Sequence, residues 1–276
     1  MSFVARVFTF IALFPVVALA GPHDFVAHVT RLGGDTSSAQ PFIDKFCRHI
    51  ETKMGWPASS VNGKFFSTKA EALAHIESEK PGIAMVEPAV FFELRNKLKL
   101  EPVLQIESKD LSWTKLNVVV KDPAFKALAD LKGKSLCAMG ADSPVYLSKI
   151  VFDGKFDAAK HFQLKPNNQS LKGVRGVLKG ECDATLLDDE TLAAAAKMEG
   201  GADLKSIYTS PKLPATALSV VGKSLTPAEK KKLAEVLTNM CSDAEGKAIC
   251  TDMRVEKFAP VDAAAFTGFG KKYDTK

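Results

Sequence analysis

Short apolar strands alternate with amphipathic helices along most of this chain, and this limits its fold more than any other feature. Three predicted strand–helix pairs come first, at residues 25–30 and 36–54, 64–67 and 69–79, and 82–86 and 88–97. A second set follows, at residues 134–139 and 144–152, 161–164 and 170–179, and 183–187 and 190–198. Such alternation is typical of βαβ units. We therefore expect a two-lobed α/β protein, each lobe a mostly parallel sheet flanked by helices.

Further extended segments lie between and after the two sets, at residues 102–106, 116–120 and 215–221. They predict two crossovers that join the lobes, with hinges near Trp113 and Pro214. The expected division of the chain is lobe 1 at residues 21–112 and 216–276, and lobe 2 at residues 113–215.

The first twenty residues have the pattern of a secretory signal peptide. A short start carrying Arg6 precedes an apolar run at residues 7–17, and Ala18-Leu19-Ala20 fits a cleavage site. A membrane anchor is the alternative, but a span needs about 20 apolar residues and the run at residues 7–17 is shorter. Cleavage would remove 20 of the 276 residues and leave 256. We expect a periplasmic or secreted protein that is not embedded in the membrane after cleavage.

The charge balance argues against a nucleic-acid partner. The chain has 37 basic and 32 acidic side chains, a formal net charge of +5, whereas nucleic-acid-binding proteins usually concentrate basic charge on one surface. A zinc site is also not expected, because the sequence has no CxxC motif and its five histidines are scattered. We predict no cofactor and no metal.

Five cysteines in an oxidising compartment allow at most two disulfides. Cys241 and Cys250 are the best candidate pair, since they lie at the ends of two consecutive predicted helices. Closing so short a loop would contribute about 2.5–3 kcal/mol. Cys137 and Cys182 each lie at a predicted strand, where they either face one another or remain buried free thiols. The pairing of these two and Cys47 stays open.

Four segments resemble, in the same order, segments of type 2 periplasmic substrate-binding proteins. Residues 128–140 (LADLKGKSLCAMG) resemble the start of their second lobe, and residues 176–187 (GVLKGECDATLL) one of its strands. Residues 82–92 (GIAMVEPAVFF) resemble the third strand and following helix of the first lobe. Residues 210–237 (SPKLPATALSVVGKSLTPAEKKKLAEVL) resemble the return crossover and helix of the phosphate, phosphite and phosphonate branch.

The resemblance covers about residues 25–270. It implies a periplasmic-binding-protein type 2 fold, joined by two hinge crossovers, that closes on a small polar ligand. It also implies an ABC permease as the partner that receives the ligand.

Candidate ligand contacts are the polar residues that follow predicted strands. In open parallel sheets, ligands bind at the carboxyl ends of the strands, beside helix N-termini with unsatisfied N–H groups. The candidates are Thr36, Ser37, Ser38, Gln40, Glu87, Asp142, Ser143, Tyr146, Asn168 and Asp188. Hydroxyls at helix starts suit an oxyanion. The alternative is that they are ordinary N-caps of their own helices.

The carboxylates among these candidates favour a different ligand. Glu87, Asp142 and Asp188 would repel a bare phosphate, whereas a zwitterion could place its cation beside them. In the phosphonate-binding branch the loop that opens the second lobe holds several hydroxyl residues. Here residues 140–144 contain Ser143 alone together with an added carboxylate, which argues against a doubly charged phosphonate. Each acid is alternatively a cap or a solvated loop residue.

Nothing in the sequence indicates catalysis. No GxSxG or HExxH element occurs, and Ser143 has no base near it in sequence. We predict a monomeric, exported solute-binding protein that captures a phosphonate-like, oxyanion or zwitterionic ligand for an ABC importer. A sensory or interaction module of the same fold, signalling to a membrane receptor, is the first alternative. A secreted enzyme on this scaffold is the second.

Overall fold

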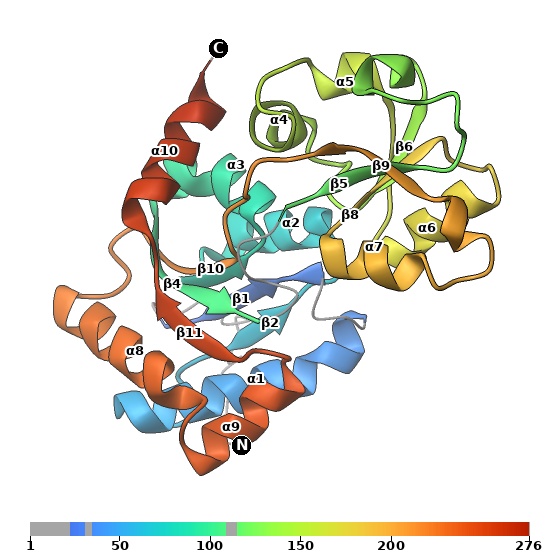
Figure 1. Cartoon of the computed structure of the whole chain (residues 1–276). Helices are drawn as coiled ribbons and strands as arrows, with labels where there is room; N and C mark the ends of the chain where they lie inside the picture. Colours follow the sequence, from blue (N-terminus) through green and yellow to red (C-terminus); the bar gives the residue numbers. More distant parts are fainter. Residues whose placement is uncertain (1–22, 31–34, 109–114, 276) are drawn as a thin grey trace, which may run out of the picture.

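The computed structural model describes residues 23–30, 35–108 and 115–275 (Figure 1). The predicted signal peptide, the boundary between residues 112 and 113, and the hinge at Trp113 therefore lie outside the described residues. Two sheets are present, and the part of the chain built around each is called lobe 1 and lobe 2 below.

The sheet of lobe 1 combines strands from both ends of the chain. Its strand order is β11 (Lys257–Pro260), β4 (Leu100–Glu107), β10 (Ala217–Val221), β3 (Ile83–Val86), β1 (Phe25–His28) and β2 (Gly63–Phe65). β1 pairs in parallel with β2 and β3, whereas β10 is antiparallel to β3 and β4, and β11 is antiparallel to β4. The parallel strands β1, β2 and β3 thus end at the same edge of the sheet.

Helices cover both faces of this sheet (Figure 1). One face carries α1 (Thr36–Met54), α8 (Pro227–Met240) and α9 (Ala244–Asp252), and the other carries α2 (Lys69–Glu79), α3 (Pro88–Leu98) and α10 (Ala263–Asp274). The strand pleat explains the division. Ile83 and Met85 of β3 pack in the α1 core, and Ala84 and Val86 pack in the α3 core, because successive strand residues face opposite sides.

Lobe 2 is smaller and repeats the plan. Its strand order is β7 (Gln163–Pro166), β6 (Ser135–Ala138), β8 (Ala184–Leu187), β5 (Asn117–Val120) and β9 (Lys205–Thr209). β6 is parallel to β7 and β8, and β5 is antiparallel to β8 and β9. Its helices are α4 (Pro144–Tyr146), the π-helical turn η3 (Leu147–Val151), α5 (Ala158–His161), α6 (Ser170–Leu178) and α7 (Asp189–Ala195). Short 3₁₀ turns occupy Leu128–Leu131 and Gly201–Asp203.

The predicted two-lobed α/β fold is confirmed, with specific differences. The chain crosses between lobes twice, from β4 to β5 and from β9 to β10, and β5 and β10 pair antiparallel with the strands beside them. Both sheets are therefore mixed. The helix expected at residues 144–152 is instead one α-helical turn followed by η3, in which the hydroxyl of Ser148 donates to the carbonyl of Pro144, 2.7 Å away.

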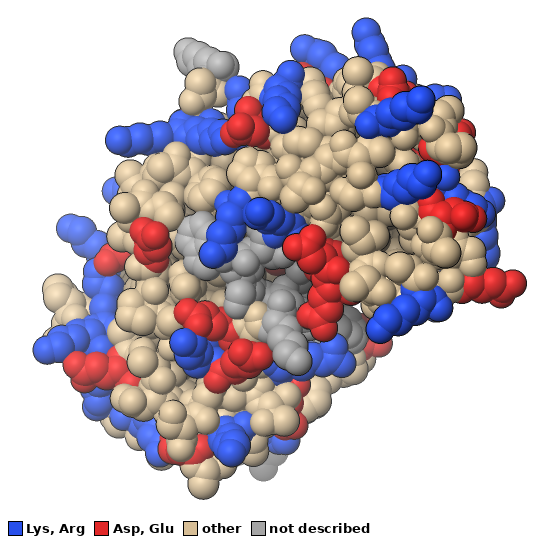
Figure 2. Space-filling view, in the orientation of Figure 1, with Lys and Arg blue, Asp and Glu red and all other residues tan. Residues whose placement is uncertain are grey.

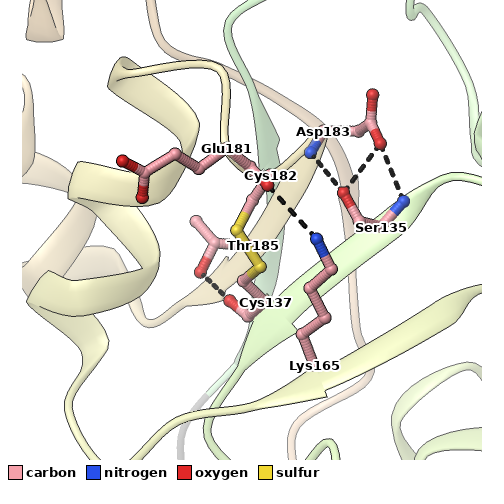
Figure 3. The surroundings of a disulfide bond; sticks show 7 residues. All are labelled: Ser135, Cys137, Lys165, Glu181, Cys182, Asp183 and Thr185. Carbon is pink, nitrogen blue, oxygen red and sulfur yellow. Dashed lines mark hydrogen bonds between the residues drawn. A yellow bond between two sulfur atoms is a disulfide. The ribbon is translucent and has the colours of Figure 1, made fainter.

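Two disulfides are present. The predicted Cys241–Cys250 bond is confirmed, and it joins the end of α8 to α9. Cys137 and Cys182 are also bonded, which settles the alternative left open by the sequence. Figure 3 shows that this bond links β6 to Cys182, two residues before the start of β8. Beside it, the hydroxyl of Thr185 donates to the carbonyl of Cys137, 2.7 Å away. Cys47 is a buried free thiol, and burial raises its pKa to about 12.

Candidate functional site

A cavity of about 440 Å³ lies between the two lobes, and its lining comes from both. Lobe 1 contributes the residues that follow β1, β2 and β3, and lobe 2 contributes the loops after β6 and β7. Charges of both signs line it: Lys69, Lys172, Glu87 and Asp142. In the space-filling view of Figure 2, basic and acidic side chains both occur along the boundary between the lobes. The cavity is therefore not a site of one charge sign.

The ends of β1 and β3 are tied together at the cavity wall. The backbone N–H of Thr30 donates to Oε1 of Glu87, 2.7 Å away, and the Thr30 hydroxyl donates to the same oxygen. Oε2 of Glu87 takes no part in these two bonds. The parallel pairing of β1 with β3 produces this contact, since it brings the residues after both strands to one edge.

His28, the last residue of β1, lines the same wall and is 3% exposed. Its Nδ1 lies 2.9 Å from the carbonyl oxygen of Phe66. Because a carbonyl only accepts, this contact places a hydrogen on Nδ1. In the neutral ring, Nε2 is then an acceptor.

Lys69 begins α2, directly after its N-cap Thr68. Its ammonium lies 2.6 Å from a carboxylate oxygen of Glu93 on α3. It also reaches across to lobe 2, where it donates to the hydroxyl of Ser143 at 2.8 Å and to the backbone carbonyl of Asp142 at 3.3 Å. Lys69 therefore lines the cavity and connects the lobes.

The lobe 2 wall is formed by the loops after β6 and β7. Ser143 is the N-cap residue of α4 and is 5% exposed. After β7, Asn168 accepts a hydrogen bond from the ammonium of Lys172 at 2.8 Å, which uses one of the three N–H groups of that lysine. The side-chain oxygen of Asn167 is buried and accepts no hydrogen bond from any described residue. An amide oxygen in this state is a candidate acceptor for a ligand.

The structure brings part of the predicted ligand set together. Glu87, Asp142, Ser143 and Asn168 line the cavity. Among the described lining residues, the following predicted contacts are not found: Thr36, Ser37, Ser38, Gln40, Tyr146 and Asp188. Their ligand roles remain predictions, and the contacts they make in the structure are described next.

Three of these residues belong to the start of α1. Asp35 is the N-cap, and it accepts hydrogen bonds from the backbone N–H of Ser38 and the hydroxyl of Ser37, both at 2.8 Å. These bonds, with that from Ser38 the strongest, lower the pKa of Asp35. The Thr36 hydroxyl lies 3.2 Å from that of Ser67, a cavity residue, so Thr36 stands one residue behind the wall.

The other three serve the interior or a cap. Gln40 bonds the backbone of β2, donating to Gly63 at 2.7 Å and accepting from Phe65 at 3.1 Å. Tyr146 is buried, with its ring stacked on that of Phe92 at a centroid distance of 6.3 Å. Asp188 caps α7 by accepting from the N–H of Thr191 at 2.7 Å.

Sequence reasoning missed the following cavity residues: His28, Thr30, Ser67, Thr68, Lys69 and Lys172. The rule that ligands bind after parallel strands applies equally to Thr30, which follows β1, and to Ser67 and Thr68, which follow β2. No local signal distinguishes Lys69 from other surface lysines, because its partner Ser143 is 74 residues away in sequence.

Residues 35–266 match the family described as the periplasmic substrate-binding protein of phosphonate ABC transporters. The chain belongs to this family. It is therefore a periplasmic solute-binding protein of an ABC importer, and the resemblance inferred from the sequence is confirmed. No curated protein matches the chain. In the part that the structure describes, no helix is long and apolar enough to cross a membrane.

Solved structures share the fold at low sequence identity. The binding-protein component of an ABC phosphonate transporter from Pseudomonas aeruginosa is 18% identical, with a TM-score of 0.63 over 91% of this chain and 87% of that one. A Xanthomonas citri protein bound to ATP is 13% identical, with a TM-score of 0.69 over 91% and 97%. PhnD1 from Prochlorococcus marinus, in complex with methylphosphonate, is 12% identical, with a TM-score of 0.63 over 91% and 97%.

Proposed function

We propose that this phosphonate-binding-family protein binds, in the cavity between its lobes, a small phosphonate-like anion that also carries a cationic group. It would act as a monomer that delivers this zwitterion to an ABC permease. The observation that supports this proposal is the charge distribution of the cavity. Hydrogen-bond donors from both lobes meet there, but so do the carboxylates of Glu87 and Asp142.

The donors suit the anionic end of the ligand. Ser67 presents a hydroxyl before the start of α2, an eleven-residue helix whose N-terminus carries partial positive charge. The Thr68 hydroxyl beside it donates to the carboxylate of Glu71 at 2.7 Å. Lys172 lines the same cavity from lobe 2 and has N–H groups beyond the one that Asn168 accepts. Charge-assisted hydrogen bonds of this kind are among the stronger contacts available to a phosphonate oxygen.

The carboxylates suit the cationic end. Lys69 does not offset them, because it is already paired with Glu93 on its own lobe. Glu87 is held at the wall by Thr30 through Oε1 alone, which leaves Oε2 as an acceptor for an ammonium group. The buried oxygen of Asn167 offers a second acceptor in the same lining. A ligand with an amine would satisfy these groups, whereas a plain dianion would be repelled by them.

The proposed action is capture by lobe closure, with no chemical step. The two crossovers would serve as hinges, and we propose lobe boundaries at residues 112–113 and 215–216. The hydroxyl of Ser143 does have an amine 2.8 Å away, on Lys69. That amine is ion-paired with Glu93, and a charged ammonium does not accept a proton from serine.

A thermal-shift panel on the mature chain, residues 21–276, tests this proposal. The panel contains alkylphosphonates, aminoalkylphosphonates, inorganic phosphate, amino acids and polyamines. A ligand at a hundredfold excess over its Kd stabilises the folded state by about 2.7 kcal/mol, so a specific ligand raises the melting temperature visibly. We expect the largest shift with an aminoalkylphosphonate. A shift with polyamines or amino acids but with no phosphonate would overturn the assignment.

A further inference from the structure

The ammonium of Lys69 is fully occupied by protein atoms. A lysine ammonium has three N–H groups, and three acceptors surround this one: Glu93 at 2.6 Å, the Ser143 hydroxyl at 2.8 Å and the Asp142 carbonyl at 3.3 Å. The Lys69 side chain is only 12% exposed. Although it lines the cavity, Lys69 in this arrangement has no N–H left to give to a ligand.

The three acceptors come from different lobes. Glu93 lies on α3 of lobe 1, while Ser143 and Asp142 belong to the loop that precedes α4 in lobe 2. Lobe 1 also fixes the start of the lysine side chain, because Lys69 is the first residue of α2 and Thr68 caps that helix through the N–H of Glu71. Glu93 thus holds the ammonium on lobe 1 in a position from which it can donate to the acceptors of lobe 2.

We propose that Lys69 is a positioning residue that stabilises the closed arrangement of the two lobes and does not contact the ligand. It would set affinity through the fraction of molecules that are closed. When only a fraction of a protein is competent to bind, the apparent Kd rises in inverse proportion to that fraction. Removing Lys69 would therefore weaken every ligand by the same factor. The effect on ligand affinity rests on the proposed function, but the effect on lobe closure does not.

A matched control lies on the same two helices. Lys97 of α3 pairs with Glu77 of α2 at 2.5 Å, so it too joins α2 to α3. Lys97 and Glu77 both belong to lobe 1, and their side chains are 62% and 50% exposed. Exposed pairs contribute little to stability. Lys97→Met removes an α2–α3 ion pair just as Lys69→Met does, but leaves the contact between lobes intact.

An ion pair between the lobes gives a further comparison. Lys272 of α10 pairs with Asp153, which follows η3, and their side chains are 35% and 44% exposed. The Lys69 contact is more buried, so we expect it to contribute more to closure than Lys272 does.

Small-angle X-ray scattering of the mature protein without ligand is the first test. We expect Lys69→Met to increase the radius of gyration, and Lys97→Met to leave it at the wild-type value. Circular dichroism and thermal melting establish that each variant is folded. If Lys69→Met does not fold, Ser143→Ala removes the shorter of the two Lys69 contacts to lobe 2 and is measured instead. An unchanged radius of gyration in folded Lys69→Met overturns the proposal, whether or not a ligand has been found.

Calorimetric titration is the second test, with an alkylphosphonate and an aminoalkylphosphonate as probes. Loss of a charge-assisted contact predicts that Lys69→Met weakens both by about the same factor, roughly tenfold. The double variant Lys69→Met/Ser143→Ala should bind only slightly more weakly than Lys69→Met, because the contact with the Ser143 hydroxyl is already lost in the single variant. A variant that loses one probe selectively would show that Lys69 touches the ligand, and this also overturns the proposal. If neither probe binds the wild-type protein, the proposed ligand is wrong and the scattering result alone decides the role of Lys69.

Discussion

The backbone N–H of Thr30 lies 2.7 Å from Oε1 of Glu87, and the Thr30 hydroxyl donates to the same oxygen. These bonds join the ends of two parallel strands that are 57 residues apart in sequence. They also orient the carboxylate, so that its charge faces the cavity from a fixed position. A preorganised acceptor of this kind binds a cation without the entropy cost of ordering a free side chain.

Glu87→Gln should therefore lower the affinity for an aminoalkylphosphonate by about tenfold, corresponding to ~1.4 kcal/mol. The amide keeps an oxygen that can accept from Thr30 but loses the negative charge. Affinity for the desamino alkylphosphonate should hold or improve, because repulsion of the anion is relieved. Calorimetric titration of both compounds measures the effect. Equal weakening of the two would indicate a structural defect and would count against a cationic contact at Glu87.

Removal of the Cys137–Cys182 bond should destabilise the protein more than removal of Cys241–Cys250. The bonds span 45 and 9 residues, and loop-closure entropy predicts losses of about 4 and about 2.6 kcal/mol. Urea unfolding of the Cys137→Ser/Cys182→Ser and Cys241→Ser/Cys250→Ser proteins provides the comparison. A larger loss from the shorter loop would show that native packing outweighs loop closure here.

Gly173→Ala should destabilise the protein by about 1–3 kcal/mol, because a Cβ there has no room. It would lie 2.7 Å from the backbone carbonyl of Cys137 and closer still to the hydroxyl of Thr185. Gly268→Ala in α10 is the matched control, since nothing lies within 4 Å of its Cβ. That change should be neutral or stabilising by up to about 1 kcal/mol. Denaturant unfolding of both variants should give changes of opposite sign or clearly different size.

Asp183 should contribute a pH-dependent part of the stability. Burial raises the pKa of Asp183. Hydrogen bonds from the backbone N–H and the hydroxyl of Ser135 outweigh this effect, so that the pKa is lowered overall. Figure 3 shows these bonds beside the disulfide. A lowered pKa in the folded state stabilises the protein above the unfolded value of about 4, and this contribution is lost as pH falls through the folded value.

Asp183→Asn is therefore predicted to be less stable than wild type at pH 6, with a difference that shrinks below about pH 4. Denaturant unfolding at a series of pH values measures it. A difference that is constant from pH 6 to pH 3 would contradict the role of the charge.

The sequence was sufficient to predict the fold because strand and helix periodicities are local. Its limits follow from contacts between distant residues. Asp188 and Tyr146 sit after strands, as ligand contacts would, yet one caps α7 and the other packs on Phe92. A polar residue at a helix start looks the same in sequence whether it caps or binds. Lys69 was not predicted because its role depends on the approach of lobe 2. β9 and β11 were missed because they are short edge strands with exposed residues and little apolar pattern.

The central claim is that the cavity recognises a phosphonate-like group and a cation together. Calorimetric titration of the mature wild-type protein with an aminoalkylphosphonate and with the alkylphosphonate of equal chain length tests it most directly. We predict that the amino compound binds at least about tenfold more tightly, a difference of ~1.4 kcal/mol. Equal affinity, tighter binding of the alkylphosphonate, or no binding of either would contradict the claim.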